Sequence, residues 1–334
     1  MKKKLLSYLL NFVLVAAVYG VLMGLNAAGV LNNFYMGVAK LIMINALLAV
    51  SLNLVTGFLG QLALGHAGFM AAGAYTSALI TLAVGSQSGM PTVVVFLLSL
   101  LAGGLVAAVF GVIIGIPALR LRGDYLAILT LGFGEIIRVL INGMEFTGGP
   151  TGLKGIPNYS GFTVVFIVCA VGIALITMFI NSRHGRAVKA IRDNEIAAEA
   201  CGVHVTFYKL LAFVIAAFFA GVAGGLFAHH ISAISPAKFN FDYSIEILVM
   251  VVLGGMGSVT GSVIAAVILT LLPQVLQDFS QYRMIVYSLL LIIMMLFRPK
   301  GLLGQYEFSI GKSAQWVRSH ISRSGRKARK EGEQ

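Results

Sequence analysis

Long apolar runs separated by short polar stretches dominate the chain. A helix needs roughly 17–25 mostly apolar residues to cross a bilayer. Two candidate runs are weaker than the others. The fifth, 124–143, contains Asp124, Glu135 and Arg138, and the eighth, 242–256, is short and ends in glycines. The pattern predicts an all-α polytopic membrane protein with about ten (8–10) transmembrane helices. The candidate runs are 5–25, 35–57, 62–85, 91–118, 124–143, 161–181, 207–231, 242–256, 259–280 and 283–298.

One polar stretch, residues 183–205, differs from the other connections because it is compatible with a helix. On a helical wheel at roughly 100° per residue, one half is small or apolar, with Val188 and Asn194 as exceptions. Gly202 is expected to end this helix, because glycine takes a positive φ without strain. The apolar half holds Ala187, Ala190, Ile191, Ala197, Ala198 and Cys201. The charged half holds Arg186, Lys189, Arg192, Asp193, Glu195 and Glu199.

The alanine-rich half of this stretch predicts what it contacts. A helix that lies on a membrane surface usually carries bulkier apolar residues such as Leu, Phe or Trp. Small side chains suit close packing against protein instead. We therefore predict that residues 183–205 dock on a protein partner.

Composition supports a membrane protein and argues against nucleic acid as a partner. Hydrophobic residues make up 58% of the chain and charged residues 11%, whereas soluble domains have about 45–50% and about 25%. The net charge of +12 comes from cations beside apolar runs, which is the positive-inside pattern. Cys169 lies in an apolar run and Cys201 in the charged stretch, so a disulfide between them is not expected, and neither belongs to a metal-ligating motif.

The distribution of loop charges predicts orientation. With the N-terminus inside, the inner stretches contain Lys2–Lys4, the arginines at 120 and 122, the 183–205 stretch and the basic end of the chain. The outer loops carry only Lys154 and Lys238. Both termini and residues 183–205 are therefore predicted to be cytoplasmic. The first run lacks a small-residue cleavage site, so it is interpreted as a retained helix.

The chain lacks an energy-transducing motif. Gly311-Lys312-Ser313 resembles the end of a phosphate-binding loop, but Tyr306 stands where that motif requires glycine. No cluster of carboxylates, histidines or nucleophiles indicates an enzyme. Energy must come from another subunit or from an ion gradient. The second option would make this a secondary transporter or channel in which the intramembrane Glu246 is the polar switch.

The order of spans allows an internal repeat. Spans two to five and seven to ten would run in opposite directions, and both blocks contain a glycine-rich break, at Gly57–Gly65 and Gly254–Gly261. Inverted repeats with broken helices line the path of many transporters, although abundant glycine makes chance correspondence the alternative. The predicted path residues are Gln61, His66, Gly68, Glu246, Gly254 and Gly255, with helix packing as the alternative for His66.

The outer loop around residues 146–152 is rich in glycine and hydroxyl side chains. It is predicted either to close over a substrate or to contact an external protein, and the alternative is an ordinary tight connection. The residues concerned are Thr147, Gly148, Gly149 and Thr151.

Within 183–205, the pattern Ile196-Ala197-Ala198, three residues, Gly202 resembles the coupling segment of ABC-importer permeases, which begins with Glu-Ala-Ala. Isoleucine replaces the usual glutamate, which leaves the role of that first position open. Further motifs from about residue 40 to 300 are similar to the branched-chain amino acid permease family, in its LivM-type branch. These are LNLVTG at 52–57 with GQ at 60–61, GHAGF at 65–69, GDYLAI at 123–128, TGGPTG at 147–152, IRDNE at 191–195 and GGMGS at 254–258.

The resemblance implies a type II ABC importer-like permease in a bacterial cytoplasmic (inner) membrane. Residues 1–305 would form the transmembrane permease domain and 306–334 a flexible basic cytoplasmic tail. Its implied partners are a second related permease, two cytoplasmic ATPase subunits that bind ATP and Mg, and an external or periplasmic substrate-binding protein. The chain itself would bind no cofactor and catalyse no bond chemistry. The implied substrates are leucine, isoleucine and valine, while related permeases carry urea and amides.

Overall fold

The computed structural model describes residues 13, 16–26, 28–29, 32–85, 91–121, 123–276, 288–289, 292, 296–297 and 301–304. The chain divides into two units. One comprises Met1–Asn33 and Tyr306–Gln334, in which the helix Ala16–Asn26 is described. The other, Phe34–Gln305, contains the helical bundle described below.

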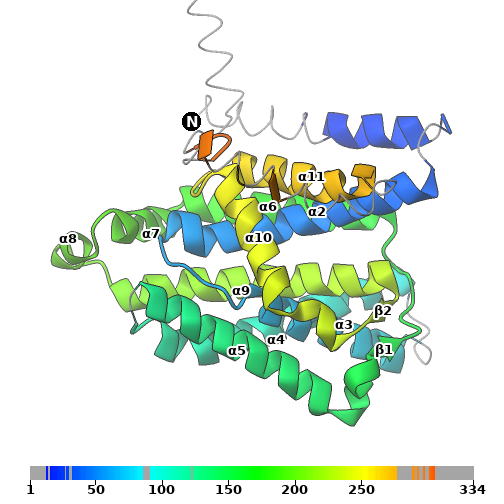
Figure 1. Cartoon of the computed structure of the whole chain (residues 1–334), viewed down its shortest axis with the longest axis horizontal. Helices are drawn as coiled ribbons and strands as arrows, with labels where there is room; N and C mark the ends of the chain where they lie inside the picture. The colour runs from blue at the N-terminus through cyan, green and yellow to red at the C-terminus, as the bar shows by residue number, and fades with distance from the viewer. Residues whose placement is uncertain are drawn as a thin grey trace, which may run out of the picture. The chain divides into compact units, whose positions relative to one another are not determined.

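Helices make up most of the second unit (Figure 1). The long ones are α2 (Asn33–Asn53), which continues as the π-helix η1 (Leu54–Phe58), α3 (His66–Val84), α4 (Thr92–Ala118), α5 (Asp124–Gly143), α6 (Phe162–Asn181) and α9 (Val205–Ile231). The shorter ones are α7 (Arg183–Asp193), α8 (Glu195–Ala200), α10 (Phe241–Gly254) and α11 (Val259–Val275). Three 3-10 helices, η2 (Glu145–Thr147), η3 (Gly149–Thr151) and η4 (Pro236–Phe239), and two strands, β1 (Leu153–Lys154) and β2 (Ala233–Ile234), occur in the connections.

Six of the described helices are long and apolar enough to cross a membrane. They coincide with the predicted runs 35–57, 62–85, 91–118, 124–143, 161–181 and 207–231, so the prediction of a helical, multi-pass membrane protein is confirmed. The charged fifth run is a helix, as predicted. The eighth and ninth runs form α10 and α11, with 14 and 17 residues. The tenth run, 283–298, lies almost entirely outside the described residues.

The most closely packed helices of the second unit are α3, α4 and α9. Glycines permit this approach, since an added Cβ on Gly73 would lie 2.2 Å from the backbone oxygen of Gly221 in α9. Without a hydrophobic driving force in lipid, such small-residue contacts are what allow membrane helices to pack tightly.

Helices α2 and α11 lie side by side and run antiparallel (Figure 1). Two side-chain amides of α2 fix their register. Asn45 donates to the Thr270 hydroxyl at 2.9 Å, and Asn53 donates to the Ser262 hydroxyl at 2.8 Å. Both asparagines are buried, so these hydrogen bonds replace the water that the amides lose.

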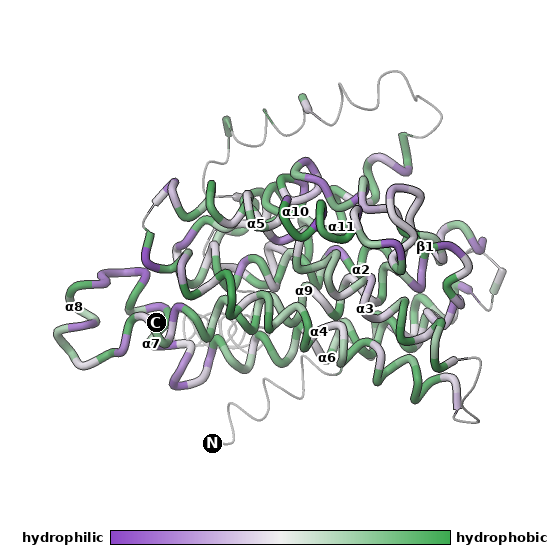
Figure 2. Tube along the Cα trace, turned by 90° about the horizontal axis from the view of Figure 1, so that it is seen from below, coloured by the Kyte–Doolittle hydropathy of each residue, from purple (hydrophilic) through white to green (hydrophobic). Residues whose placement is uncertain are grey.

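Polar residues gather at the two ends of the bundle, and apolar residues dominate between them (Figure 2). Helices α7 and α8 lie at one end, and the antiparallel pair β1–β2 lies at the other (Figure 1). Helix α9 runs between these two ends, so it connects them directly.

Candidate functional site

The segment 183–205 folds as two helices, whereas a single helical wheel was predicted. Ser182 caps α7 by accepting a hydrogen bond from the Gly185 N–H, and the backbone becomes extended at Asn194. The Asn194 side chain then caps α8 by accepting from the Ala197 N–H at 3.0 Å. Asn194 was an exception on the wheel, and its preference for capping over a helix interior is the physical reason for the break.

Gly202 ends α8 as predicted. Its φ is +82°, and its N–H donates to the Glu199 carbonyl while the Val203 N–H donates to the Ala198 carbonyl. This left-handed position is one that glycine occupies without Cβ strain.

The interruption of the helix at Asn194 changes which side chains of the segment face the bundle. Val188 and Ile191 of α7 and Ala198 of α8 are buried, so Val188 was misplaced by the wheel. Much of the alanine-rich face is open: Ala190, Ala197 and Cys201 are exposed. Ile196 is 75% exposed, which places a large apolar side chain on the surface at the position where the family pattern has glutamate.

The predicted charged residues divide into two sets. Arg186, Asp193 and Glu199 are exposed. The other three contact the bundle: Arg192 Nη1 donates to the Gly57 carbonyl at 3.0 Å, Lys189 Nζ lies 5.2 Å from the Phe58 ring centroid, and Glu195 Oε2 lies 2.9 Å from Lys209 Nζ.

Lys209 was missed by the sequence reasoning. Its side chain is only 4% exposed in α9, and its ammonium is paired with Glu195. Charged groups are rarely buried without a partner, so a lysine one turn into an apolar run next to a charged segment was the available signal.

The two predicted glycine-rich breaks meet each other next to Arg192 of α7. An added Cβ on Gly57 would lie 2.2 Å from the Gly257 nitrogen. The Asn53 side chain joins them, donating to the Ser258 carbonyl at 2.9 Å and accepting from the Gly257 N–H at 2.9 Å. Residues 301–304 also reach this junction, because the Leu302 N–H donates to the Leu253 carbonyl at 2.7 Å.

The six predicted path residues occupy different environments. His66 is buried and hydrogen-bonded to Ser51 at 2.8 Å, whereas the Oε1 atom of Gln61 is buried without a hydrogen-bond partner among the described atoms. Gly68 lies against the Gly134 backbone of α5, Gly254 against Gly261 and Gly255 against Gly304. Glu246 lies on the exposed side of α10. Their assignment to a path stays a prediction.

Helices α3 and α10 begin at the same depth of the bundle. The Ala67 N–H at the start of α3 donates to the Ser244 hydroxyl near the start of α10 at 3.2 Å. The start of α3 also packs on Thr130 and Gly134, near the middle of α5. Two helix N-termini therefore meet in the interior of the bundle, a position that transporters use for polar substrate groups.

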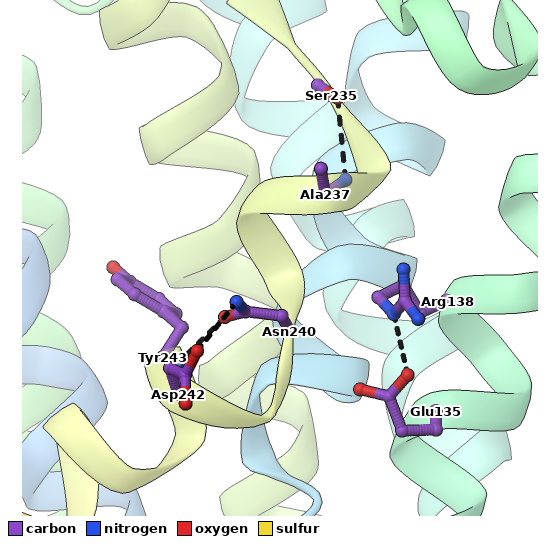
Figure 3. Close-up of polar contacts among 7 residues, drawn as sticks. All are labelled: Glu135, Arg138, Ser235, Ala237, Asn240, Asp242 and Tyr243. Carbon is purple, nitrogen blue, oxygen red and sulfur yellow. Dashed lines mark hydrogen bonds and ion pairs between the residues drawn. The ribbon is translucent and has the colours of Figure 1, made fainter.

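Several charged groups lie near this depth. Glu135 Oε2 and Arg138 Nε of α5 form an ion pair at 2.7 Å, and both side chains are about one-third exposed. Figure 3 shows them extending from α5 to the side on which η4 and the start of α10 lie. Asp242 and Glu246 of α10 are exposed as well. Such groups are costly against lipid, so this side of the molecule is expected to face protein or water.

The 144–156 connection forms a fixed structure at the β1–β2 end. The buried Thr147 hydroxyl donates to the Ile141 and Met144 carbonyls, and the Thr151 hydroxyl donates to the Gly148 carbonyl. Gly148 and Gly149 both have positive φ. The Thr147 hydroxyl is therefore used in local hydrogen bonds, whereas the Thr151 side chain is exposed on the surface.

Within the described residues, no group of three or more His, Cys, Asp or Glu side chains has the arrangement needed to hold a metal ion. The polar features at the α7–α8 end are hydrogen bonds and ion pairs that connect chain segments.

Comparisons with known proteins identify relatives of this chain. Residues 34–297 match the family model described as the permease component of branched-chain amino acid transport systems. The permease LivM of Salmonella typhimurium is 40% identical over 301 residues, covering 80% of this chain and 69% of LivM. BraD of Pseudomonas aeruginosa is 28% identical over 285 residues, covering 78% of this chain and 92% of BraD. LivH of Escherichia coli is 33% identical over 147 residues, covering 43% of this chain and 47% of LivH. No solved structure matches.

Proposed function

The chain belongs to the family of permease components of branched-chain amino acid transport systems, and from this membership we propose that it is one permease half of an ATP-driven importer for leucine, isoleucine and valine. The related LivM, BraD and LivH proteins are high-affinity branched-chain amino acid permeases by name. The substrate assignment rests on that relationship.

The proposed assembly contains a second, related permease, two ATPase subunits and an external binding protein. The similarity of this chain to both LivM and LivH supports a pairing of two related permeases. The charged side chains near the middle of α5 and the start of α10 support the same proposal, because a second permease would shield them from lipid. ATP and Mg would bind to the ATPase subunits.

The proposed orientation places α7, α8 and both chain termini in the cytoplasm of a bacterial cell, with the permease in the inner membrane. The concentration of cations at 183–209 and their scarcity at 144–160 and 232–241 support it. The β1–β2 end would then face outward, toward the binding protein. We further propose that the chain has ten spans.

An inverted repeat is the proposed basis of alternating access. Helix α2 is followed by the nonhelical segment 59–65 and α3, and helix α9 is followed by the irregular segment 232–240 and α10. In this pairing the counterpart of the first break is 232–240, whereas the sequence pattern had paired that break with Gly254–Gly261, which lies one helix later, between α10 and α11. The meeting of the Ala67 N–H with the Ser244 hydroxyl supports the pairing of these blocks, because both second helices begin at one depth. A substrate path near that depth would accept the charged ends of an amino acid.

The observation that carries the proposal is that the α7–α8 segment contacts the bundle on one side and is exposed on the other. One side is attached to the bundle through Arg192 and Glu195, while Ile196, Glu199 and Gly202 are exposed. An exposed surface that is rigidly connected to the helices is what an external ATPase would need in order to shift their packing.

The substitution Gly202→Arg tests this function in the transporter reconstituted with its partner subunits. An added Cβ at Gly202 meets nothing within 4 Å, so the arginine would project toward the partner. We expect uptake and substrate-stimulated ATP hydrolysis to be abolished while membrane insertion is normal. Gly29→Arg is the matched control, because Gly29 also has a positive φ (+71°) and open surroundings. Unimpaired, ATP-dependent uptake by Gly202→Arg would refute the proposal.

A further inference from the structure

Arg192 is the residue at which the α7–α8 segment meets both glycine-rich breaks. It is the penultimate residue of α7, two positions before the Asn194 break and three before the paired Glu195. Its side chain is 28% exposed, so most of its length is covered by the bundle.

The guanidinium contacts the first break through a backbone carbonyl. Arg192 Nη1 donates to the Gly57 carbonyl at 3.0 Å, across 135 positions of sequence. Gly57 belongs to the π-helical turn η1, and such turns often occur at functional sites. A charged donor makes this a stronger hydrogen bond than a neutral one.

The rest of the side chain requires two glycines. An added Cβ on Gly60 would lie 2.7 Å from Arg192 Cγ, so the aliphatic part of the arginine occupies that space. An added Cβ on Gly257, in the second break, would lie 3.0 Å from Arg192 Nη1. Both glycines have positive φ, at +78° and +88°. The arginine therefore lies in a recess formed by the two breaks together.

Asn53 extends this connection into α11. Its amide joins the second break at Gly257 and Ser258 and continues to the Ser262 hydroxyl of α11. Displacement of α7 would consequently act on η1 directly, and on the start of α11 through Gly257 and Asn53. Lys189 adds a second, weaker contact to η1 through the Phe58 ring.

We propose that Arg192 is the positioning residue that couples the partner-facing α7–α8 segment to the two glycine-rich breaks, which close that end of the transport path. This inference rests on the proposed importer function. It assigns Arg192 to the permease side of the segment, whereas the wheel placed it with the residues that face the ATPase. Loss of its contacts would let the ATPases cycle without moving the breaks.

The experiment measures ATP hydrolysed per molecule of labelled leucine imported, in vesicles that contain the complete transporter and loaded binding protein. We expect Arg192→Ala to raise this ratio at least tenfold. Arg192→Lys keeps the charge but loses the planar fork, so a smaller rise is expected. Arg120→Ala is the control, because Arg120 is exposed in the α4–α5 connection, and it should show the wild-type ratio.

An unchanged ratio for Arg192→Ala would overturn the proposal, even if uptake and hydrolysis fell together, because a parallel fall indicates only a loss of assembled transporter. If the transporter with Arg192→Ala does not assemble, Arg192→Lys is measured in its place. A wild-type ratio of ATP hydrolysed to leucine imported for Arg192→Lys would then overturn the proposal. Gly202→Arg in the same vesicles separates the two proposals. If it blocks uptake while Arg192→Ala leaves the ratio unchanged, only the role of Arg192 is wrong. If Gly202→Arg also imports normally, the proposed function is wrong.

Discussion

The two ends of the bundle are held together by different kinds of contact. At the β1–β2 end, segments near residues 153 and 234 join through backbone pairing, and the Ile156 N–H donates to the Ser232 carbonyl at 3.1 Å. At the α7–α8 end, long side chains make the connections: Arg192 to a carbonyl, Lys189 to a ring and Glu195 to Lys209.

This difference indicates which end can move. Backbone pairing fixes both segments at close range, whereas the side-chain contacts at the other end join α7 and α8 to η1 and α9, so that a shift of α7 is passed to the segments that it contacts. The exposed surface that a partner would use is also at the side-chain end. We therefore interpret the β1–β2 end as the fixed end and the α7–α8 end as the adjustable one.

Disruption of the fixed end should have the largest effect on stability. An added Cβ on Gly152 would lie 2.0 Å from the Ile234 carbonyl oxygen, so Gly152→Ala would separate β1 from β2. Gly155→Ala is the control for a positive φ (+75°) in open surroundings, whereas Gly152, at φ +76° and ψ +178°, also lies in a backbone region that only glycine favours. The control should cost only about 1–2 kcal/mol for the positive φ, and Gly152→Ala about 1–3 kcal/mol more from overpacking and backbone strain together. Thermal unfolding of the detergent-solubilised chain measures both, and equal shifts would contradict a tight fixed end.

Disruption of the adjustable end should cost less. Glu195→Ala leaves the Lys209 ammonium buried without its carboxylate. We expect about 1–3 kcal/mol, below the roughly 3–5 kcal/mol of a fully buried pair, because the Glu195 side chain is 31% exposed. Lys209→Met removes the buried charge and should destabilise less. Hydrogen exchange of the α8 amides, alongside thermal unfolding, measures the effect. A larger loss for Lys209→Met than for Glu195→Ala would show that this ion pair is not what holds α8.

The smallest effect on stability is expected at Ile196. Ile196→Ser should change the free energy of unfolding by no more than about 0.5 kcal/mol, because the side chain is 75% exposed. If a partner covers it, the substitution should weaken ATPase binding roughly tenfold or more, since burial of an isoleucine side chain contributes about 1.5–3 kcal/mol. Binding of the purified ATPase subunits provides the measurement. Unchanged binding would remove Ile196 from the partner surface.

Much of the fold could be predicted from hydropathy alone. Six apolar runs correspond to long helices because lipid requires length and apolar surface from any spanning element. Helix α3 starts at His66, four residues after the predicted start, because the preceding residues make contacts with distant parts of the chain. Residues 59–65 are nonhelical where they lie against Arg192 and α5, and no local pattern encodes that contact.

The candidate site was predictable in location but less so in detail. Its helix-compatible charged sequence and Gly202 identified the segment. A helical wheel assumes one continuous helix, however. Asn194 ends α7 and caps α8, so the residues of α8 do not face the directions that the wheel assigns to them. The inward direction of Arg192 depends on the space that Gly60 and Gly257 leave, and those residues are far away in sequence. The burial of Lys209 depends on Glu195 in the same way.

The pairing of β1 with β2 also orders events during synthesis. Leu153 pairs with Ile234, which is made 81 residues later. At about 5–20 residues per second, the β1 backbone waits roughly 4–16 s for its partner, until all of α9 has been made. The formation of this strand pair is therefore timed by the ribosome, and translation that pauses within α9 would lengthen the interval in which β1 is open to a wrong strand.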